Sequence, residues 1–263
     1  MVSKLSPLIA IVGETASGKS ALAMAVAHKF NGEIICADSR TVYKGMDIGT
    51  AKPSTEDRAA VPHHLLDVVN PDQSYNVVSF QKQTQEAIKE ITEKGKLPIL
   101  VGGTGLYADS VLYNLDFEAV TEERNSLNPR HQKDRGFPSE GKELRPNTLL
   151  IGITMPKEAL EERIVKRVDQ MLSDGLEQEV KSLSDEYGWD AAAMSATGYI
   201  EWRRYFEDSQ TLEQTKELII IHTRQYAKRQ RTWFKRNKSI QWVKSSDEAV
   251  ELTGKFLANP TTN

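Results

Sequence analysis

The stretch that most constrains the fold of this chain is LIAIVGETASGKS, residues 8–20. The apolar run over 8–12 predicts a strand that is buried on both faces. The residues after it fill every fixed position of the phosphate-binding loop pattern G-x-x-x-x-G-K-S/T, namely Gly13, Gly18, Lys19 and Ser20. In such a loop the backbone N–H groups and the N-terminal end of the following helix surround an anion. The pattern predicts that Lys19 faces phosphate oxygens and that Ser20 offers its hydroxyl to Mg²⁺.

Composition narrows the class of protein. The chain has 263 residues, a net charge of −3 and one cysteine, Cys36. A single cysteine excludes a disulfide framework and a multi-cysteine zinc module. No signal-peptide pattern and no apolar run of about 20 residues are present, so we expect a cytoplasmic protein without a membrane segment. The weak net charge means that any nucleic-acid binding must be local.

Strand and helix patterns alternate along the chain. Further strands are predicted at 33–37, 98–101, 148–154 and 240–243, and helices at 21–30, 77–94, 155–183 and 212–235. Residues 61–76 look irregular. This alternation is typical of the α/β class, with a parallel sheet covered by helices on both faces. Residues 114–147 are polar and carry three prolines, so we expect one core from 1–113 and 148–263, interrupted by a loop or small excursion.

Two polar residues follow predicted strands. Ligands of parallel sheets bind beyond the carboxyl ends of strands, so Asp38 and Thr104 should share one pocket with the phosphate-binding loop. Asp38 could be a general base, an indirect Mg²⁺ ligand or only a turn residue. Thr104 could bond a phosphate oxygen or only shape a turn. The neighbouring His63 and His64 point in different directions in an extended chain, which favours structural or substrate contacts over a metal site.

The last long helix is strongly basic on one side. Residues 222–238 contain no acid, and a 4-3-4 spacing aligns one stripe of cations: Arg224, Lys228, Arg231 and Lys235. A solvated face is one interpretation. An unbalanced stripe also favours contact with a polyanion such as an RNA backbone.

Seven strings in the chain resemble the family of bacterial tRNA dimethylallyltransferases, also called IPP transferases. They are GETASGKS, DSRTVYKGMDIGTAKP, PHHLLD, LVGGTGLY, ERIVKRVDQMLSDGLEQEV, ATGYIEW and TRQYAKRQRTWF. The resemblance extends from residue 8 to about 235, except for the middle segment. It implies a P-loop NTPase-like, three-layer fold.

The resemblance also implies a reaction. The dimethylallyl group leaves its diphosphate and is attacked by N6 of the adenosine on the 3′ side of the anticodon in tRNA. Asp38 is implied as the proton acceptor, with Lys19 and Thr104 also catalytic. The diphosphate would lie, with Mg²⁺ at Ser20, against Gly13, Glu14, Thr15, Ala16, Ser17, Gly18, Lys19, Ser20, Arg163, Arg167 and Arg224. The tRNA contacts expected from the matching stretches and the basic stripe are Asp38, Ser39, Arg40, Thr41, Thr104, Arg124, Gly198, Tyr199, Lys228, Arg231 and Lys235.

The chain departs from this family in two places. Thr41 stands where many relatives carry Gln, and the longer helical insertion that embraces the anticodon stem is replaced by the short segment 114–147. The missing insertion affects how tRNA is bound more than how the reaction is catalysed. The alternatives are transfer to free adenine nucleotides, a small-molecule kinase using ATP, and an inactive RNA-binding relic. We expect a monomer that binds dimethylallyl diphosphate and tRNA.

Overall fold

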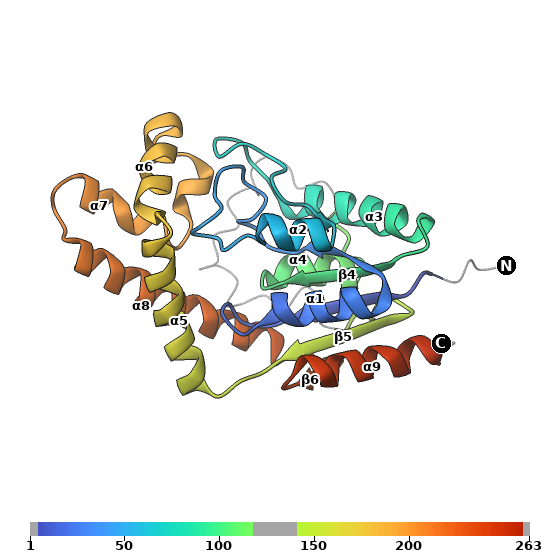
Figure 1. The fold of residues 1–263 in the computed structure, drawn as a ribbon. Coiled ribbons are helices and arrows are strands. Elements are labelled where there is room, and N and C mark those ends of the chain that lie inside the picture. The colour runs from blue at the N-terminus through green and yellow to red at the C-terminus, as the bar shows by residue number, and fades with distance from the viewer. Residues whose placement is uncertain (1–4, 118–140, 260–263) are drawn as a thin grey trace.

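The computed structural model describes residues 5–117 and 141–259, and it confirms the α/β class. Its sheet has the strand order β3-β2-β4-β1-β5-β6, and every neighbouring pair is parallel (Figure 1). The strands are β1 (Leu8–Val12), β2 (Gly32–Cys36), β3 (His63–His64), β4 (Leu97–Gly102), β5 (Thr148–Ile153) and β6 (Gln241–Val243).

Helices connect these strands and extend beyond them. The first group is α1 (Lys19–Phe30), α2 (Thr55–Ala60), α3 (Val77–Glu93) and α4 (Gly105–Leu112). The second is α5 (Lys157–Ser173), α6 (Leu176–Tyr187), α7 (Arg203–Phe206), α8 (Leu212–Phe234) and α9 (Ser246–Ala258). Capping side chains fix several helix starts. The Thr211 hydroxyl, for example, accepts a hydrogen bond from the Gln214 N–H at the start of α8.

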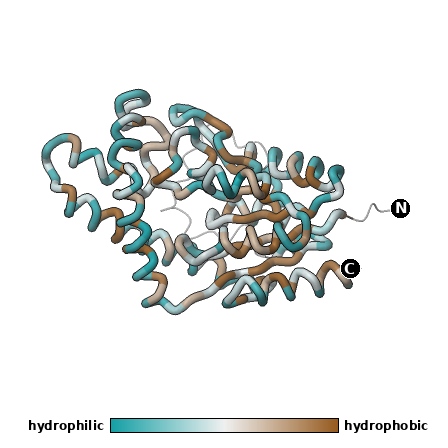
Figure 2. The backbone as a smooth tube through the Cα atoms, viewed as in Figure 1, coloured by the Kyte–Doolittle hydropathy of each residue, from teal (hydrophilic) through white to brown (hydrophobic). Residues whose placement is uncertain are grey.

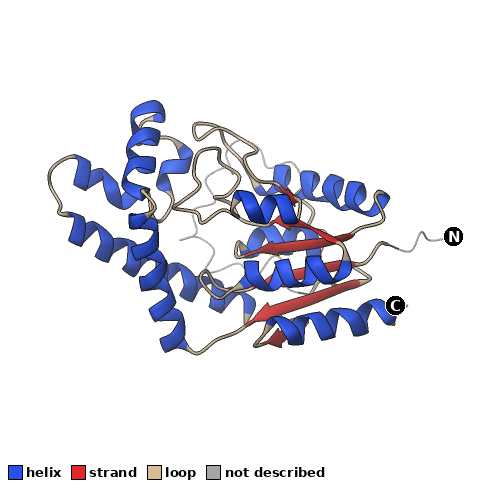
Figure 3. Cartoon of the chain, in the orientation of Figure 1, coloured by secondary structure: helices blue, strands red, loops and turns tan. Residues whose placement is uncertain are grey.

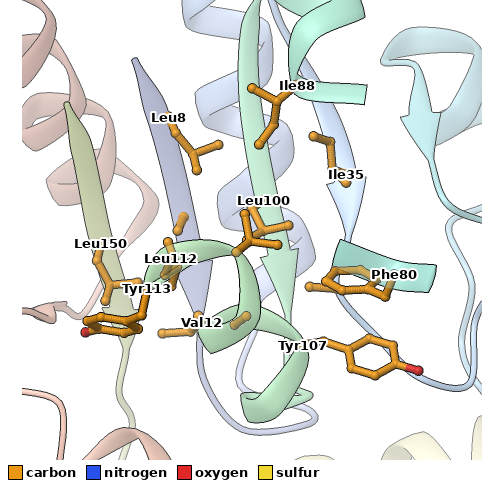
Figure 4. Close-up of a cluster of buried hydrophobic side chains, with 14 of the residues drawn as sticks. Leu8, Val12, Ile35, Phe80, Ile88, Leu100, Tyr107, Leu112, Tyr113 and Leu150 are labelled. Atoms are coloured by element: carbon orange, nitrogen blue, oxygen red, sulfur yellow. The ribbon is translucent and has the colours of Figure 1, made fainter. Parts of the chain in front are cut away.

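The core has three layers, with the sheet between two pairs of helices (Figure 3). Helices α3 and α4 cover one face of the sheet, and α1 and α9 cover the other. Apolar side chains of the strands alternate between these faces: Leu8 and Leu100 pack toward α3 and α4, as Figure 4 shows. The rings of Phe80 and Tyr107 stack there at 4.4 Å between centroids. Figure 2 shows hydrophobic residues concentrated along the central strands.

A third apolar cluster lies beyond the carboxyl ends of the strands, where α5, α6 and α8 pack together (Figure 1). Tyr199 and Trp202 are fully buried in it. The cluster also buries Val42 and Met46, which belong to the loop that follows β2. It therefore supports that loop from the side facing away from the sheet.

Polar contacts fix the same loop in shape. The Lys52 ammonium is buried and donates to Tyr43 O (2.6 Å), Asp47 Oδ1 (2.8 Å) and Asp67 Oδ1 (2.5 Å). The carboxylate of Glu179 on α6 accepts hydrogen bonds at 2.7 to 3.0 Å from three successive backbone N–H groups, those of Asp47, Ile48 and Gly49. Residues 43–52 are thus held by charge-assisted bonds that reach in from two other segments.

Several elements differ from the sequence prediction. The helix predicted over 155–183 is two helices, because Gly175 adopts a left-handed conformation (φ 99°) at the break between α5 and α6. Helix α2 and strand β3 formed no part of the prediction. Helix α2 has a capping box between Ser54 and Asp57, and β3 is a short strand that pairs with Ile34 and Ile35.

The segment 114–147 is described only at its ends. Leu115 is buried in the core, and the Arg145 N–H donates to Leu112 O at 2.7 Å. The remainder of the predicted interruption lies outside the described residues. Over the described ranges no helix is both long enough and apolar enough to cross a membrane.

Replacing Gly49 with Ala should destabilise the chain, because a Cβ at this position would lie 2.5 Å from the buried ring of Tyr199. We expect the free energy of unfolding to fall by about 1–3 kcal/mol, as measured by urea denaturation. The matched control is Gly254→Ala in α9, where the nearest atom to an added Cβ is 3.6 Å away on Phe30. The control should be neutral or stabilising by up to about 1 kcal/mol. Equal stability of Gly49→Ala and wild type would contradict this packing.

Candidate active site

The phosphate-binding loop connects β1 to α1 in the conformation that the sequence predicts. Gly13 (φ 152°) and Gly18 (φ 99°) both take positive φ angles, which side chains disfavour. Helix α1 starts at Lys19, so its N-terminal end faces the loop. The Lys19 ammonium donates to Glu14 O at 2.5 Å and lies across the loop.

Asp38 and Thr104 lie beside each other, since β2 and β4 are neighbours in the sheet. The Asp38 carboxylate accepts a hydrogen bond from the Arg40 N–H at 2.8 Å, which forms a local turn. The Thr104 hydroxyl accepts one from the Ser39 N–H at 3.1 Å. Both residues therefore shape turns, but Asp38 also lines the cavity described next.

A cavity of about 220 Å³ joins the phosphate-binding loop to Asp38. Its polar wall includes Thr15, Lys19, Ser20, Asp38 and Arg167, and its apolar wall includes Ala23, Met24, Ile34, Cys36, Pro53 and Val101. The predicted common pocket is confirmed for the loop and Asp38. Thr104 stands beside the cavity, next to the lining residue Gly103.

Two cations face Asp38 in this cavity. Burial lowers the pKa of Lys19 to about 8, with the charge of Arg167 acting in the same direction and the Asp38 carboxylate acting against both. Burial also lowers the pKa of Arg167, whose guanidinium donates to Thr50 O at 3.3 Å. The site thus holds excess positive charge away from water, an arrangement suited to a phosphate anion.

Cys36 and His63 of the cavity, and the neighbouring His64, have structural surroundings. Burial raises the pKa of the Cys36 thiol to about 12, so it stays protonated at neutral pH and is a poor nucleophile. His63 Nδ1 bonds Val61 O at 2.7 Å, and His64 Nε2 bonds Glu33 at 2.7 Å on another side. These are contacts of the structural kind that the sequence favoured. The described residues contain no cluster of three His, Cys, Asp or Glu able to hold a metal ion.

Helix α8 reaches the site through residues that the sequence analysis did not propose. Gln230 accepts a hydrogen bond from the Thr15 N–H and donates to Gly103 O. Tyr226 lies one turn earlier. Burial raises the pKa of its phenol to about 12, although hydrogen bonds with Thr104 and Gln230 act in the opposite direction. The available signal was a glutamine within the otherwise apolar and aromatic stripe of the helix, since a buried amide needs hydrogen-bond partners.

The basic stripe of α8 is divided between two roles. Arg231 forms a bidentate ion pair with Glu14, with Nε–Oε1 at 2.5 Å and Nη2–Oε2 at 2.9 Å. Glu14 therefore neutralises Arg231, which also lines the groove between α5 and α8, and its predicted contact with RNA stays a prediction. Arg224, Lys228 and Lys235 line a groove of about 460 Å³ between α5 and α8, and they make no ion pair within the described residues.

The structure also locates most of the other predicted site residues. Arg224 lies in this outer groove and not among the cavity residues, whereas the Arg163 guanidinium lies close to Gly18 of the loop. Gly198 and Tyr199 are buried, and the Tyr199 hydroxyl donates to Glu179 Oε1 at 2.6 Å. Gly198 and Tyr199 pack against the loop that contains Gly49, which gives them a structural role, and their contact with tRNA stays a prediction. Arg124 lies outside the described residues.

The other predicted tRNA contacts belong to the loop that follows β2. The Thr41 hydroxyl is buried, lines the cavity and has no hydrogen-bond partner among the described residues. Arg40 donates to Ala192 O at 3.4 Å, which directs its guanidinium toward the third apolar cluster. Ser39 is held against Thr104. An unpartnered, cavity-lining hydroxyl is a group that a bound ligand can satisfy.

Replacing Lys19 with Met should stabilise the ligand-free chain at pH 7, because it removes a buried charge. The pKa of Lys19 is about 8 in the folded chain and 10.5 ordinarily, so wild type gains stability as pH rises between these values. We expect an advantage of about 1–3 kcal/mol at pH 7 that shrinks from pH 8 to 10.5, measured by urea denaturation. Lys29→Met, at an exposed position on the same helix, is the control. A constant advantage across this range would contradict the assignment.

Comparisons with known proteins agree with this geometry. A family model described as IPP transferase matches residues 41–138 and 128–237. The tRNA dimethylallyltransferase of Carboxydothermus hydrogenoformans is 41% identical, covering 97% of this chain and 98% of that protein. That of Pelotomaculum thermopropionicum is 38% identical, covering 92% of each. These alignments run over 304 and 289 positions, more than the length of this chain, so those relatives carry residues without a counterpart here.

Solved structures are similar over the whole fold. The tRNA isopentenylpyrophosphate transferase of Bacillus halodurans has a TM-score of 0.83 and 34% identity, covering 97% of both chains. That of Staphylococcus epidermidis has a TM-score of 0.81 and 38% identity, covering 96% of this chain and all of the other. A eukaryotic dimethylallyltransferase acting on tRNA has a TM-score of 0.83 and 26% identity, covering 97% of this chain and 81% of that one. With its P-loop NTPase-like fold, its phosphate-binding loop and these matches, the chain belongs to the IPP transferase family.

Proposed function

We propose that this chain transfers a dimethylallyl group from dimethylallyl diphosphate to N6 of an adenosine in tRNA, next to the anticodon on its 3′ side. The observation that carries the proposal is the single cavity in which Lys19, Ser20 and Arg167 face Asp38. One end of that cavity suits an anionic leaving group, and the other presents a carboxylate able to accept a proton. The relatives named tRNA dimethylallyltransferase support the identity of both substrates.

The cations act on the leaving group. As the bond between the allylic carbon and oxygen breaks, negative charge accumulates on the departing diphosphate. Lys19, Arg167 and the loop N–H groups stabilise that charge, with Arg163 at the loop's outer side. A bound diphosphate also favours the protonated form of Lys19, which reverses the effect of burial on its pKa.

Asp38 acts on the acceptor. The adenine must leave its stack to reach a buried cavity, as in other enzymes that modify bases. Its N6 amine attacks the allylic carbon and loses a proton, which the Asp38 carboxylate accepts. The bond from the Arg40 N–H fixes one carboxylate oxygen, Oδ1, and leaves Oδ2 to meet the amine. Thr104 lies close enough to Ser39 to hold this turn in place.

Mg²⁺ fits the residues present. Mg²⁺ usually keeps several waters and is held by one or two protein oxygens together with substrate phosphates. The Ser20 hydroxyl lines the cavity and can supply one such oxygen. When bound, the ion would neutralise diphosphate charge beside Lys19.

The groove between α5 and α8 suits an RNA backbone. Its floor is apolar, from Leu160, Ile164 and Ala227, and Arg224, Lys228 and Lys235 stand along it. A free adenine nucleotide bound in the cavity would not reach a row of cations outside it, and the same holds for the substrate of a small-molecule kinase. The groove therefore favours tRNA over those alternatives. One chain supplies Lys19, Asp38 and Thr104, so a monomer suffices, and a tRNA acceptor is consistent with a cytoplasmic protein.

The function is tested by giving the purified chain labelled dimethylallyl diphosphate with tRNA and AMP side by side. We expect label on tRNA and none on AMP. In Asp38→Asn, kcat should fall by about 10²–10⁴, because Asn cannot accept a proton, while the binding of dimethylallyl diphosphate is retained. Transfer to AMP alone would overturn the tRNA proposal. Lost diphosphate binding with an unchanged kcat would make Asp38 a metal or structural residue.

Lys228→Ala should weaken tRNA binding and flatten its salt dependence, because each lost phosphate contact lowers the slope of log K against log salt by roughly 1. Lys82→Ala, at an exposed position on α3, is the matched control. Arg231→Ala should leave the slope nearly unchanged, since Glu14 already neutralises this cation. Wild-type affinity and slope in Lys228→Ala would show that RNA is held elsewhere.

A further inference from the structure

Gln230 is the point where α8 joins two loops of the site. Its side chain is only 4% exposed, and both ends of its amide are used. Oε1 accepts from the Thr15 N–H at 2.7 Å, and Nε2 donates to Gly103 O at 2.9 Å. Thr15 belongs to the loop after β1, and Gly103 to the loop after β4. A single buried amide therefore spans the gap between them.

The surroundings of this amide belong to the cavity. Thr15, Gly103 and Gln230 all line it, and Thr104 follows Gly103 directly. A Cβ at position 103 would lie 2.2 Å from Gln230 Nε2, so any side chain there would displace this amide. The next residue of α8, Arg231, holds Glu14 through both carboxylate oxygens. Two successive residues of the helix thus hold two successive residues of the phosphate-binding loop.

We propose that Gln230 is a positioning residue, which sets the distance between the phosphate-binding loop and the Gly103–Thr104 turn. The inference rests on the proposed placement of the diphosphate on that loop. With the amide in place, a diphosphate bound near Lys19 is also within the reach of the turn that carries Thr104. A displacement of about 1 Å between such groups can cost about 10²-fold in rate. This role concerns turnover and not tRNA binding, because Gln230 does not line the groove between α5 and α8.

The sharpest test is Gln230→Glu, because a carboxyl group can donate to Gly103 O only when it is protonated. Burial and the facing carbonyl oxygen should raise the pKa of this new carboxyl above its usual range. We expect the kcat of this variant to be about 10–100-fold below that of wild type at pH 8 and to recover toward the wild-type value as the pH falls to 6. The KM for tRNA should stay within about twofold of wild type. Lys19, Asp38, Tyr226, Glu14 and Arg231 surround position 230, and taking the ratio to wild type at each pH removes the part of the pH dependence that both proteins share.

Two companion variants separate the possible outcomes. Gln178→Glu, at an exposed position on α6, should give a ratio near one at every pH. Gln230→Met is similar in shape but has no hydrogen bonds, so its kcat should be about 10–100-fold lower at all pH values, and it provides the test should the Glu variant fail to fold. A pH-independent ratio in Gln230→Glu, or wild-type kcat in Gln230→Met, would overturn the inference.

Lys19→Ala measured alongside distinguishes this inference from the proposed function. Loss of turnover in Lys19→Ala with unaffected Gln230 variants would refute the positioning role alone. Full turnover in Lys19→Ala would refute the placement of the diphosphate on the loop, on which both proposals depend.

Discussion

The close approach of the carboxyl ends of β2 and β4 determines where the chemistry can take place. The Ala37 N–H donates to Val101 O at 2.7 Å, and the Thr104 N–H donates back to Ala37 O at 3.3 Å. A Cβ at Gly102 would lie 1.9 Å from Ala37 O, so only glycine allows this contact. Any side chain at this position would separate the turn of Asp38 from the turn of Thr104.

The sequence was sufficient to predict those parts of the fold and the site that depend on a local pattern of residues. The apolar run before Gly13 predicted β1, and the fixed positions of the loop predicted its conformation and the start of a helix near Lys19. Asp38 could be placed in the cavity because parallel strands share a ligand-binding edge. The first two inferences need only the residue types within a few positions of one another, and the third adds the alternation of strands and helices along the chain.

The sequence was insufficient wherever a residue takes its role from a distant partner. The acid-free run around Arg231 suggested a free cation, but its partner Glu14 lies 217 positions away. Tyr199 carries a hydroxyl that could meet RNA, yet its ring fills the space beside Gly49 and its hydroxyl bonds Glu179. No local pattern contains this information, because it arises only when the C-terminal helices pack on the loop after β2.

The hydrogen bonds between α8 and the phosphate-binding loop also determine when the site can form during synthesis and folding. Thr15 is made early in synthesis, whereas its partner Gln230 follows 215 residues later. Contacts of such separation form late in folding, after the cost of closing a long loop has been met. The nascent chain can therefore complete its central strands while the first loop of its active site still lacks the helix that holds it. Any growing chain shorter than about 230 residues already contains the sequence of the phosphate-binding loop but cannot yet form the complete site.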